Sequence, residues 1–243
     1  MVQQYDLLII GAGPGGLSAA NEAAKEGLKV LVLEEHKEIG VPVHCGECFS
    51  EFSAKKDQLR IPSDIISKKV KGVRVTFPNG KKVCVEEPGF VLKKDKFEQW
   101  LAKQAKESGA RIRTASKATD IEKVEGGYEI TSLSQKIFAK IVIDASGANS
   151  FAATKIGINK SAKTVLGVQY LVKDIKWDNY LDFYILPKYA PYGYLWVIPK
   201  ENNFANIGLV SKEKGKKAMD NLDRFLDYLT IPKKNAVKTF GGL

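Results

Sequence analysis

The chain has 243 residues, of which 44% are hydrophobic and 27% are charged, and its formal net charge is +10 at pH 7. This composition is that of a globular protein with enough length for one large or two modest cores. Because no run of about 18 apolar residues occurs, the sequence predicts no membrane-spanning helix. The apolar start at residues 7–10 is too short for a secretory signal, and three cysteines are too few for a disulfide framework. We therefore expect a cytoplasmic protein.

The positive charge comes mainly from lysines scattered singly and in pairs. Such a surface favours an acidic partner, for example nucleic acid, anionic lipid or a phosphorylated substrate, but it also fits an ordinary solvated surface. No arginine-rich stripe or nucleic-acid-binding motif accompanies it. We therefore expect no nucleic-acid partner, and charge alone decides nothing further.

The N-terminal segment predicts a strand, a glycine turn, a helix and a second strand. Residues 7–10 and 29–34 are nearly continuous apolar runs, which are typical of strands buried on both faces of a parallel sheet. Between them, apolar residues recur at helical spacing and the helix is expected to end at Gly27. This order of elements is a βαβ unit.

The glycine turn of this unit carries a dinucleotide-binding motif. Gly11, Gly13 and Gly16 form G-x-G-x-x-G between strand and helix, and Glu34 ends the second strand. Gly11 permits the tight turn, Gly13 lets the backbone approach a pyrophosphate and Gly16 lets helix and strand pack closely. The N-terminus of the helix then faces the phosphates, and Glu34 accepts hydrogen bonds from ribose hydroxyls.

The rest of the chain predicts a mixture of strands and helices. Residues 70–87 alternate around an Asn-Gly turn, which indicates a hairpin, and residues 94–110 have a helical apolar face. Strands are then expected within 111–115, 118–132 and 136–147. Three longer strands rich in tyrosine and tryptophan follow between 163 and 211, and a helix spans 216–229. We expect no regular element after residue 229.

The stretch "VHCGECFS" at residues 43–50 places Cys45 and Cys48 in C-x-x-C spacing, directly after His44. A zinc site would need further ligands, and the chain offers few. A redox dithiol is a second possibility, because flavins and dithiols exchange electrons. A buried, inert pair is the third. The residues alone leave these alternatives open.

The stretch "YGYLWVIPK" places aromatic residues at Tyr192, Tyr194 and Trp196, in strand alternation and therefore on one face. That face is either an ordinary sheet core or one wall of a long apolar tunnel. Pro199 is expected to end the strand. Lys200, which follows it, is a candidate ligand for a phosphate headgroup.

The stretch "IVIDASGANS" resembles the second fingerprint of the flavin-dependent hydroxylase and reductase superfamily, a strand that ends in "ADG" followed by a serine. Ala145, Ser146, Gly147 and Ser150 match this pattern, with serine where the superfamily has aspartate. The position of "GAGPGG" near the N-terminus also favours FAD over a nicotinamide as the bound dinucleotide.

Four further stretches resemble the geranylgeranyl reductase family, flavoproteins that saturate isoprenoid double bonds. They are residues 38–50, 93–110, 191–200 and 205–209. The resemblance implies an α/β fold, with an FAD-binding Rossmann-type domain and an inserted antiparallel β-sheet substrate domain, as in p-hydroxybenzoate hydroxylase. We expect the FAD-binding domain to comprise residues 1–45 and 89–160, and the substrate domain residues 46–88 and 161–243. The superfamily's "GDAA" motif is absent from this sequence.

The resemblance implies an FAD-dependent reductase of isoprenoid chains in membrane lipids, and it assigns residues to three roles. Candidate catalytic residues are Cys45, Glu47 and Tyr194. Candidate cofactor-binding residues are Gly11, Gly13, Pro14, Gly15, Gly16, Glu34, Cys45, Gly46, Lys94, Ala145, Ser146 and Gly147. Candidate substrate-binding residues are Tyr192, Tyr194, Trp196 and Pro199. In this interpretation Cys45 lines the active site, Cys48 stands where the family has glycine, and no metal is expected.

The implied partners are an isoprenoid lipid, an external electron donor (ferredoxin, NADPH or a deazaflavin) and the inner face of a membrane, with which the protein makes peripheral contact. Two alternatives stay open. The first is a flavin-dependent monooxygenase or halogenase of the same fold, because "YLWVIP" partly matches a halogenase signature. The second is a non-catalytic homologue that binds lipid or a partner subunit.

Overall fold

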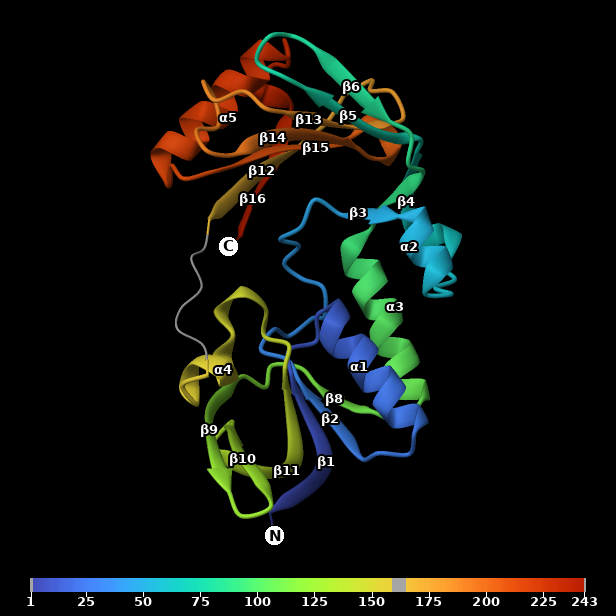
Figure 1. Ribbon diagram of the computed structural model, residues 1–243, viewed down its shortest axis with the longest axis vertical. Coiled ribbons are helices and arrows are strands. Elements are labelled where there is room, and N and C mark those ends of the chain that lie inside the picture. Colours follow the sequence, from blue (N-terminus) through green and yellow to red (C-terminus); the bar gives the residue numbers. More distant parts are fainter. Residues whose placement is uncertain (1, 159–164, 243) are drawn as a thin grey trace. The chain divides into compact units, whose positions relative to one another are not determined.

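The computed structural model of the chain describes residues 2–158 and 165–242 (Figure 1). Within this range the chain forms two compact units, one of residues 2–42 and 95–158 and the other of residues 43–94 and 165–242. Residues 43–45 and 89–94, which we predicted for the first unit, lie in the second. The predicted boundary at residues 160–161 and the predicted strand start at Lys163 lie outside the described residues.

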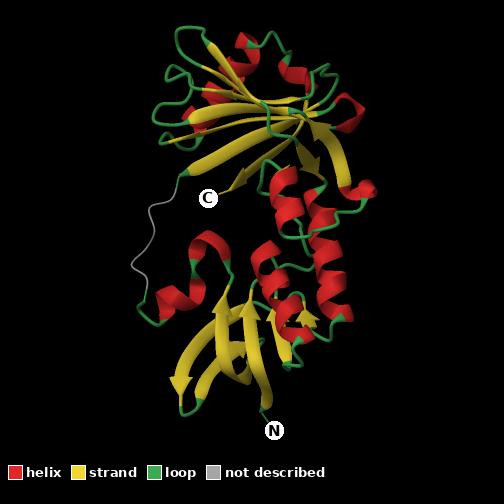
Figure 2. Ribbon diagram, turned by 45° about the vertical axis from the view of Figure 1, so that its right-hand side comes forward, coloured by secondary structure: helices red, strands yellow, loops and turns green. Residues whose placement is uncertain are grey.

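The first unit is built on a six-stranded sheet with helices packed beside it (Figure 2). Four neighbouring strands are parallel, and two antiparallel strands extend the sheet at one edge. In sheet order the strands are β8 (Arg111–Arg113), β2 (Val30–Leu33), β1 (Gln3–Ile10), β11 (Gln135–Asp144), β10 (Gly127–Ser132) and β9 (Ala118–Val124). The helices are α1 (Pro14–Lys25), which contacts β1 and β2, α3 (Lys94–Glu107) and α4 (Phe151–Lys155).

The second unit contains a seven-stranded sheet, a three-stranded sheet and two helices. The large sheet is antiparallel except where β13 pairs with β5. Its order is β16 (Ala236–Gly242), β12 (Leu166–Val172), β15 (Ala205–Ser211), β14 (Tyr194–Pro199), β13 (Tyr180–Tyr184), β5 (Gly72–Thr76) and β6 (Lys82–Val85). The small sheet has the order β3 (Cys48–Ser50), β7 (Gly89–Leu92) and β4 (Ile66–Val70), and the helices are α2 (Glu51–Lys56) and α5 (Lys216–Tyr228).

The large sheet of the second unit buries different side chains on its two faces, because side chains alternate along a strand. One face packs on α5, where Leu222 and Phe225 are fully buried against the strands. On the other face Trp196 and Phe183 pack against a small cluster that includes Val91 of the three-stranded sheet. The second face is therefore the one that carries Trp196, one of the aromatic side chains predicted from the sequence.

The structure confirms the predicted fold class, with a Rossmann-type unit and a second β-sheet unit. The βαβ unit, the hairpin at residues 72–85 and the helix beginning at Lys216 are all present. Two predictions are wrong. Four strands, not three, lie between residues 165 and 211, and β16 forms after residue 229 because β12 offers it an unpaired edge. No helix in the described part of the chain is long and apolar enough to cross a membrane.

The close packing of α1 against the glycine turn after β1 can be tested directly. A Cβ on Gly16 would lie 2.1 Å from the backbone oxygen of Gly11, whereas a Cβ on Gly15 would have nothing within 4 Å. We therefore expect Gly16→Ala to lower the free energy of unfolding by about 2 kcal/mol or more, as overpacking does. Gly15→Ala, also in α1, should be neutral or stabilising by about 0.5 kcal/mol. Urea unfolding of both variants measures this, and equal stabilities would contradict it.

Candidate functional site

The turn between β1 and α1 brings three backbone segments together. Gly11 has a φ of +102°, and a Cβ there would lie 2.4 Å from the backbone oxygen of Ala145. The N–H of Ala145 in turn donates to the carbonyl of Ile10 at 2.9 Å. The predicted roles of Gly11 and Gly16 as close-packing glycines thus have a clear physical basis.

The start of α1 has the features of a phosphate-binding helix end. The helix begins at Pro14 after Gly13, and no side chain caps it. Cβ atoms built on Gly13 and Gly15 would meet nothing within 4 Å, so there is open space in front of these residues. Free N–H groups and open space at a helix N-terminus favour an anionic group such as a pyrophosphate.

Glu34 lies directly after β2 and is only 8% exposed. Its Oε2 accepts a hydrogen bond from the N–H of Ala12 at 2.8 Å, and its Oε1 accepts one from the N–H of His36 at 2.9 Å. The Nδ1 of His36 lies 2.6 Å from the same oxygen. Since a carboxylate has about four acceptor positions, one position is left for a ribose hydroxyl. The role predicted for Glu34 fits this geometry, and Glu34 also holds the glycine turn.

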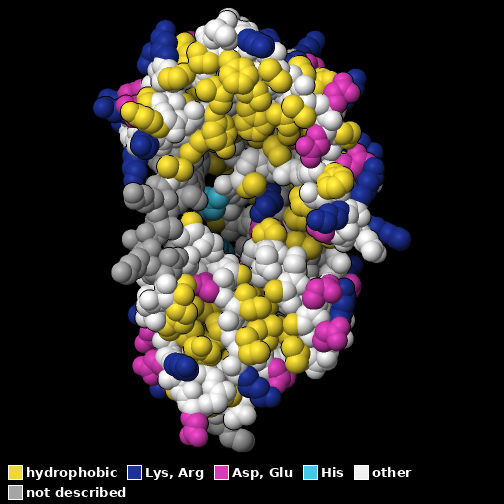
Figure 3. Space-filling model, viewed as in Figure 1, with side chains coloured by type: hydrophobic (Ala, Val, Ile, Leu, Met, Phe, Trp, Pro, Cys, Tyr) yellow, Lys and Arg dark blue, Asp and Glu magenta, His cyan; other side chains and the backbone are white. Residues whose placement is uncertain are grey.

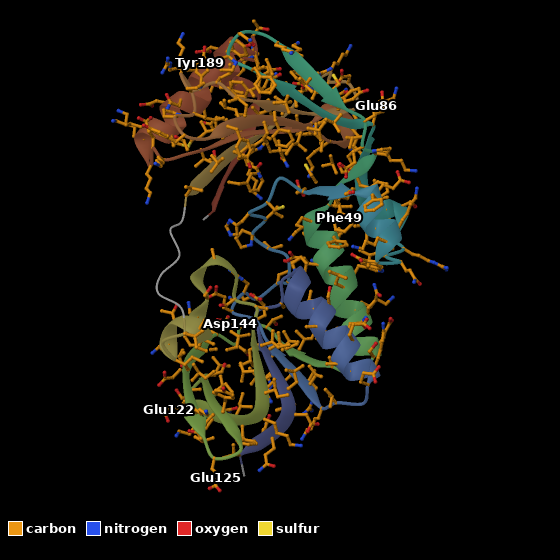
Figure 4. The ribbon with its side chains drawn as sticks, in the orientation of Figure 1. Phe49, Glu86, Glu122, Glu125, Asp144 and Tyr189 are labelled. Carbon is orange, nitrogen blue, oxygen red and sulfur yellow. The ribbon has the colours of Figure 1, made fainter. Side chains whose placement is uncertain are left out.

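The segment after β11 is held by Asp144 (labelled in Figure 4). Its carboxylate accepts hydrogen bonds from the hydroxyl of Ser146 at 2.5 Å and from the N–H of Ala153 at 3.0 Å. The Ser146 hydroxyl accepts from the N–H of Phe151 at 2.8 Å. Although burial would raise the pKa of Asp144, these hydrogen bonds lower it. Ser146, predicted to bind the cofactor, therefore has internal partners, and Ala145 and Gly147 offer mainly backbone groups.

In the second unit, the loop that carries Cys45 is attached to the large sheet. The Nε2 of Gln169 donates to the carbonyl of Cys45 at 3.0 Å, and the Oε1 of Gln169 accepts from the Nε1 of Trp196 at 3.1 Å. The Sγ of Cys45, an exposed residue, accepts from the N–H of Glu47 at 3.2 Å. A small pocket of about 90 Å³ lies here, lined by His44, Cys45, Gly46, Gly167, Val168, Gln169, Trp196, Phe240 and Gly241.

The aromatic side chains predicted as substrate-binding do not all share one face. Tyr194 and Trp196 do, with ring centroids 6.0 Å apart, and Phe183 lies 5.8 Å from Tyr194. Tyr192 does not, because β14 begins only at Tyr194. Tyr192 has a φ of +56° and is 85% exposed, so its predicted place in the strand alternation is wrong. Pro199 ends β14, as predicted, and is buried.

Glu47 lies at the centre of a buried polar cluster. It is 6% exposed and has a φ of +71°. One carboxylate oxygen accepts from the N–H of Lys94 at 3.1 Å, and the other accepts from the Nδ2 of Asn206 at 2.7 Å and forms an ion pair with the Nζ of Lys200. Lys200, predicted as a headgroup ligand, is thus committed to Glu47. A carboxylate with three donors is suited to hold the loop rather than to release a proton.

The two cysteines of C-x-x-C differ in their surroundings. Cys48 begins β3, and its Sγ donates to the carbonyl of Gly46 at 3.6 Å. Burial, followed by the proximity of Cys45 and Glu47, raises the pKa of Cys48 to about 12. The residue still exposes part of its surface, so water reaches it, but its thiol is protonated at neutral pH. Within residues 2–158 and 165–242 no group of three or more metal-ligating side chains of His, Cys, Asp or Glu lies together.

Two residues of this site were missed by the sequence reasoning, although each left a signal. Gln169 and Asn206 are polar residues within otherwise apolar strands, and both are buried, at 5% and 2% exposure. A buried amide needs partners, because an unpaired one costs free energy. Their partners are the Cys45 loop and Glu47, which the sequence had singled out.

The ion pair of Glu47 leads to a stability prediction. Glu47→Gln leaves the Lys200 ammonium buried without a counter-charge, which should lower the free energy of unfolding by about 3 kcal/mol. A second substitution, Lys200→Met, should restore much of that loss. Glu201→Gln is a matched control, since it breaks the more exposed pair with Lys93 (3.0 Å) and should cost less than about 1 kcal/mol. Similar losses in denaturant unfolding for both single variants would contradict this assignment.

Comparison with known proteins places the chain in a family. The family model described as "Lycopene cyclase protein" matches residues 6–207. A digeranylgeranylglycerophospholipid reductase of Methanosarcina acetivorans is 35% identical over 98% of this chain and 63% of its own length. One of Thermoplasma volcanium is 36% identical over 93% of this chain and 62% of its own. The chain thus spans somewhat less than two thirds of these relatives.

Solved structures agree with this placement. A geranylgeranyl bacteriochlorophyll reductase-like protein of Thermoplasma acidophilum matches with a TM-score of 0.92 and 32% identity, over 100% of this chain and 66% of that one. A flavin-dependent brominase matches with a TM-score of 0.81 at 20% identity, over 99% of this chain and 67% of that one, which shows a common fold alone. The chain therefore belongs to the family described as lycopene cyclase proteins, and it is similar to proteins named as geranylgeranyl reductases.

Proposed function

We propose that this chain is the dinucleotide- and lipid-binding part of an FAD-dependent reductase that saturates C=C bonds in isoprenoid chains of membrane lipids. The observation that carries the proposal is the hydrogen-bonded connection from Trp196 through Gln169 to the Cys45 loop. This connection joins two features. One is an aromatic sheet face, which is suited to bind an apolar chain, and the other is the Cys45 loop, which the family resemblance places at the active site. The names of the relatives support the same substrate class.

The first unit fits an FAD molecule. Gly13 and Gly15 leave open space at the start of α1, where a pyrophosphate would accept backbone hydrogen bonds. Glu34 keeps one acceptor position for the adenosine ribose. Of the other predicted cofactor residues, Ala145, Ser146 and Gly147 lie in the first unit, whereas Cys45, Gly46 and Lys94 lie in the second. We propose that the three residues of the first unit contact the ribityl portion of the cofactor.

Reduction of an isolated C=C bond adds a hydride to one carbon and a proton to its neighbour. When bound, the reduced flavin supplies the hydride. The proton must come from a side chain within hydrogen-bonding reach or from water. Among the three candidate donors, Cys45 and Tyr194 are exposed, whereas the ion pair and hydrogen bonds of Glu47 commit it to the loop. We therefore propose Cys45 or Tyr194 as the donor and Glu47 as a positioning residue.

Trp196 and Tyr194 would hold the isoprenoid chain. Apolar and aromatic walls bind such a chain by removing it from water. Because the indole N–H of Trp196 donates to Gln169, the ring has a fixed orientation. The likeness to the brominase concerns the fold, and no contact in the second unit favours halogenation over reduction.

A first prediction concerns the cofactor. Gly13→Ala places a methyl group in the open space where the pyrophosphate is expected, so it should weaken FAD binding by about tenfold, or about 1.4 kcal/mol. The variant should unfold at nearly the same denaturant concentration as the parent, since the added Cβ meets no protein atom. Titration followed by flavin fluorescence measures the affinity. Unchanged affinity would place the pyrophosphate elsewhere.

A second prediction separates the three interpretations of the cysteines. Cys45→Ser should slow the oxidation of reduced flavin by an isoprenoid substrate in a single turnover. The substitution replaces a side chain that we propose either as the proton donor or as part of the active-site lining. Cys48→Gly should leave the rate intact, since the Cys48 thiol is protonated and bonded to its own loop. A redox dithiol predicts instead near-total loss in both variants. A zinc site predicts bound metal in elemental analysis and loss of stability on chelation.

A further inference from the structure

One end of the seven-stranded sheet collects three loops. Thr76 pairs with Tyr184 and Tyr184 pairs with Leu195, so the loops that follow β5 and β13 leave the sheet side by side. The N–H of Lys212, just after β15, donates to the carbonyl of Pro191 at 3.4 Å and adds a third segment. We call residues 77–82, 185–193 and 212–214 the loop end of the sheet.

The loop end exposes apolar and aromatic surface. Phe77 is 38% exposed and Tyr192 is 85% exposed. Phe77 also lines a groove of about 520 Å³, together with Pro78, Asn79, Lys81 and Val83. In Figure 3 hydrophobic side chains form a broad patch over the part of the second unit that carries α5, β5 and β6 in Figure 1, with lysine and arginine side chains at its margin. Such a patch marks an interaction surface.

This groove continues the aromatic sheet face by strand register. Trp196 pairs with Phe183, Phe183 pairs with Val75 and Val75 pairs with Val83, so these side chains form one row across four strands. At about 4.8 Å between neighbouring strands, the row is roughly 14 Å long. It connects the proposed site of the isoprenoid chain to the groove at the loop end.

The charge of the loop end is strongly positive. Its 18 residues contain five lysines and one acidic residue, Glu213, whose carboxylate accepts from the Nδ2 of Asn221 at 2.9 Å. The Nζ of Lys212 lies 4.3 Å from the ring centroid of Tyr192, and that of Lys188 lies 5.5 Å from the ring centroid of Tyr189. A lysine over the ring of an exposed tyrosine, as Lys212 is over Tyr192, is typical of surfaces at a membrane interface when apolar side chains lie nearby.

The first unit offers a contrast. Its β9–β10 hairpin exposes Val124 at 37%, a fraction close to that of Phe77. Its turn, however, carries Glu122 and Glu125 around Lys123 (Figure 4). An exposed apolar residue is therefore combined with positive charge at the loop end and with negative charge at this hairpin.

We propose that the loop end docks on an anionic lipid bilayer, with Phe77 and Tyr192 in the headgroup region and the lysines over lipid phosphates. The proposal rests on the proposed function in one respect, since a membrane-lipid substrate has to be drawn from a bilayer. Lysines near an anionic surface attract it and salt weakens the attraction. Docking would bring the groove, and the row of apolar side chains behind it, against the lipid chains.

The test uses the purified chain and two kinds of vesicle, one of phosphatidylcholine alone and one of phosphatidylcholine mixed with phosphatidylglycerol. We expect co-sedimentation with the mixed vesicles only, and less of it at high salt. Lys81→Gln with Lys82→Gln should weaken binding by about tenfold or more, as each lysine contributes about fivefold near such a surface. Phe77→Ser with Tyr192→Ser should weaken binding at every salt concentration. Lys123→Gln with Val124→Ser, in the first-unit hairpin, is the matched control and should bind as the parent does.

Equal binding to both vesicles, or parent-like binding by both loop-end double variants, would overturn the proposal. Circular dichroism and FAD titration show whether each variant is folded. Single-turnover oxidation of reduced flavin by a detergent-dispersed isoprenoid alcohol should be unchanged in the variant that combines Lys81→Gln with Lys82→Gln, since docking is bypassed. If the parent binds mixed vesicles through the loop end but never binds FAD, the docking surface stands and the proposed function fails. If the parent is an active reductase and these substitutions do not change its binding to vesicles, the proposed function stands and the docking surface fails.

Discussion

The second unit depends on the buried carboxylate of Glu47. Its ion pair with Lys200 and its hydrogen bond from Asn206 tie the Cys45 loop to the ends of β14 and β15, and the N–H of Lys94 adds the start of α3. A buried charge of this kind is destabilising unless its partners are present together. The segments that provide them are far apart in sequence, so the loop takes its position only when the sheet has formed. The Cys45 loop is therefore held in place by contacts with distant segments of the fold.

The two faces of the large sheet have different packing requirements. The face on α5 is filled with apolar side chains and needs only shape and volume. The opposite face carries Trp196, and it does so because Gly208 lies beneath the ring: a Cβ there would be 2.4 Å from Trp196 Cζ2 and 2.5 Å from the Cβ of Gln169. The glycine gives the indole room to lie across β15 and to donate to Gln169. Gly208 thus determines the orientation of the Trp196 ring.

The sequence predicted the elements whose signals are local. The glycine turn, the Asn79-Gly80 hairpin and the helix from Lys216 each depend on residues within one turn or one period of the pattern. It could not predict pairings that join distant segments, such as β13 with β5 or β16 with β12. For the same reason Lys200 was interpreted as a free cation, since its partner Glu47 is 153 residues away. The prediction for Tyr192 is wrong because its left-handed backbone conformation leaves no trace in the sequence. The spacing of Tyr192, Tyr194 and Trp196 still alternates as it would in a continuous strand.

The C-x-x-C motif shows how backbone geometry gives a pattern its meaning. Between the two cysteines, Glu47 adopts a left-handed conformation, and the chain then enters β3. Such a conformation is unfavourable for a residue with a Cβ, so the buried contacts of its carboxylate have to stabilise it. The same contacts leave Cys45 exposed in the loop and fix Cys48 at the start of a strand, bonded to Gly46. Burial of Glu47 between the two cysteines thus gives each of them different surroundings.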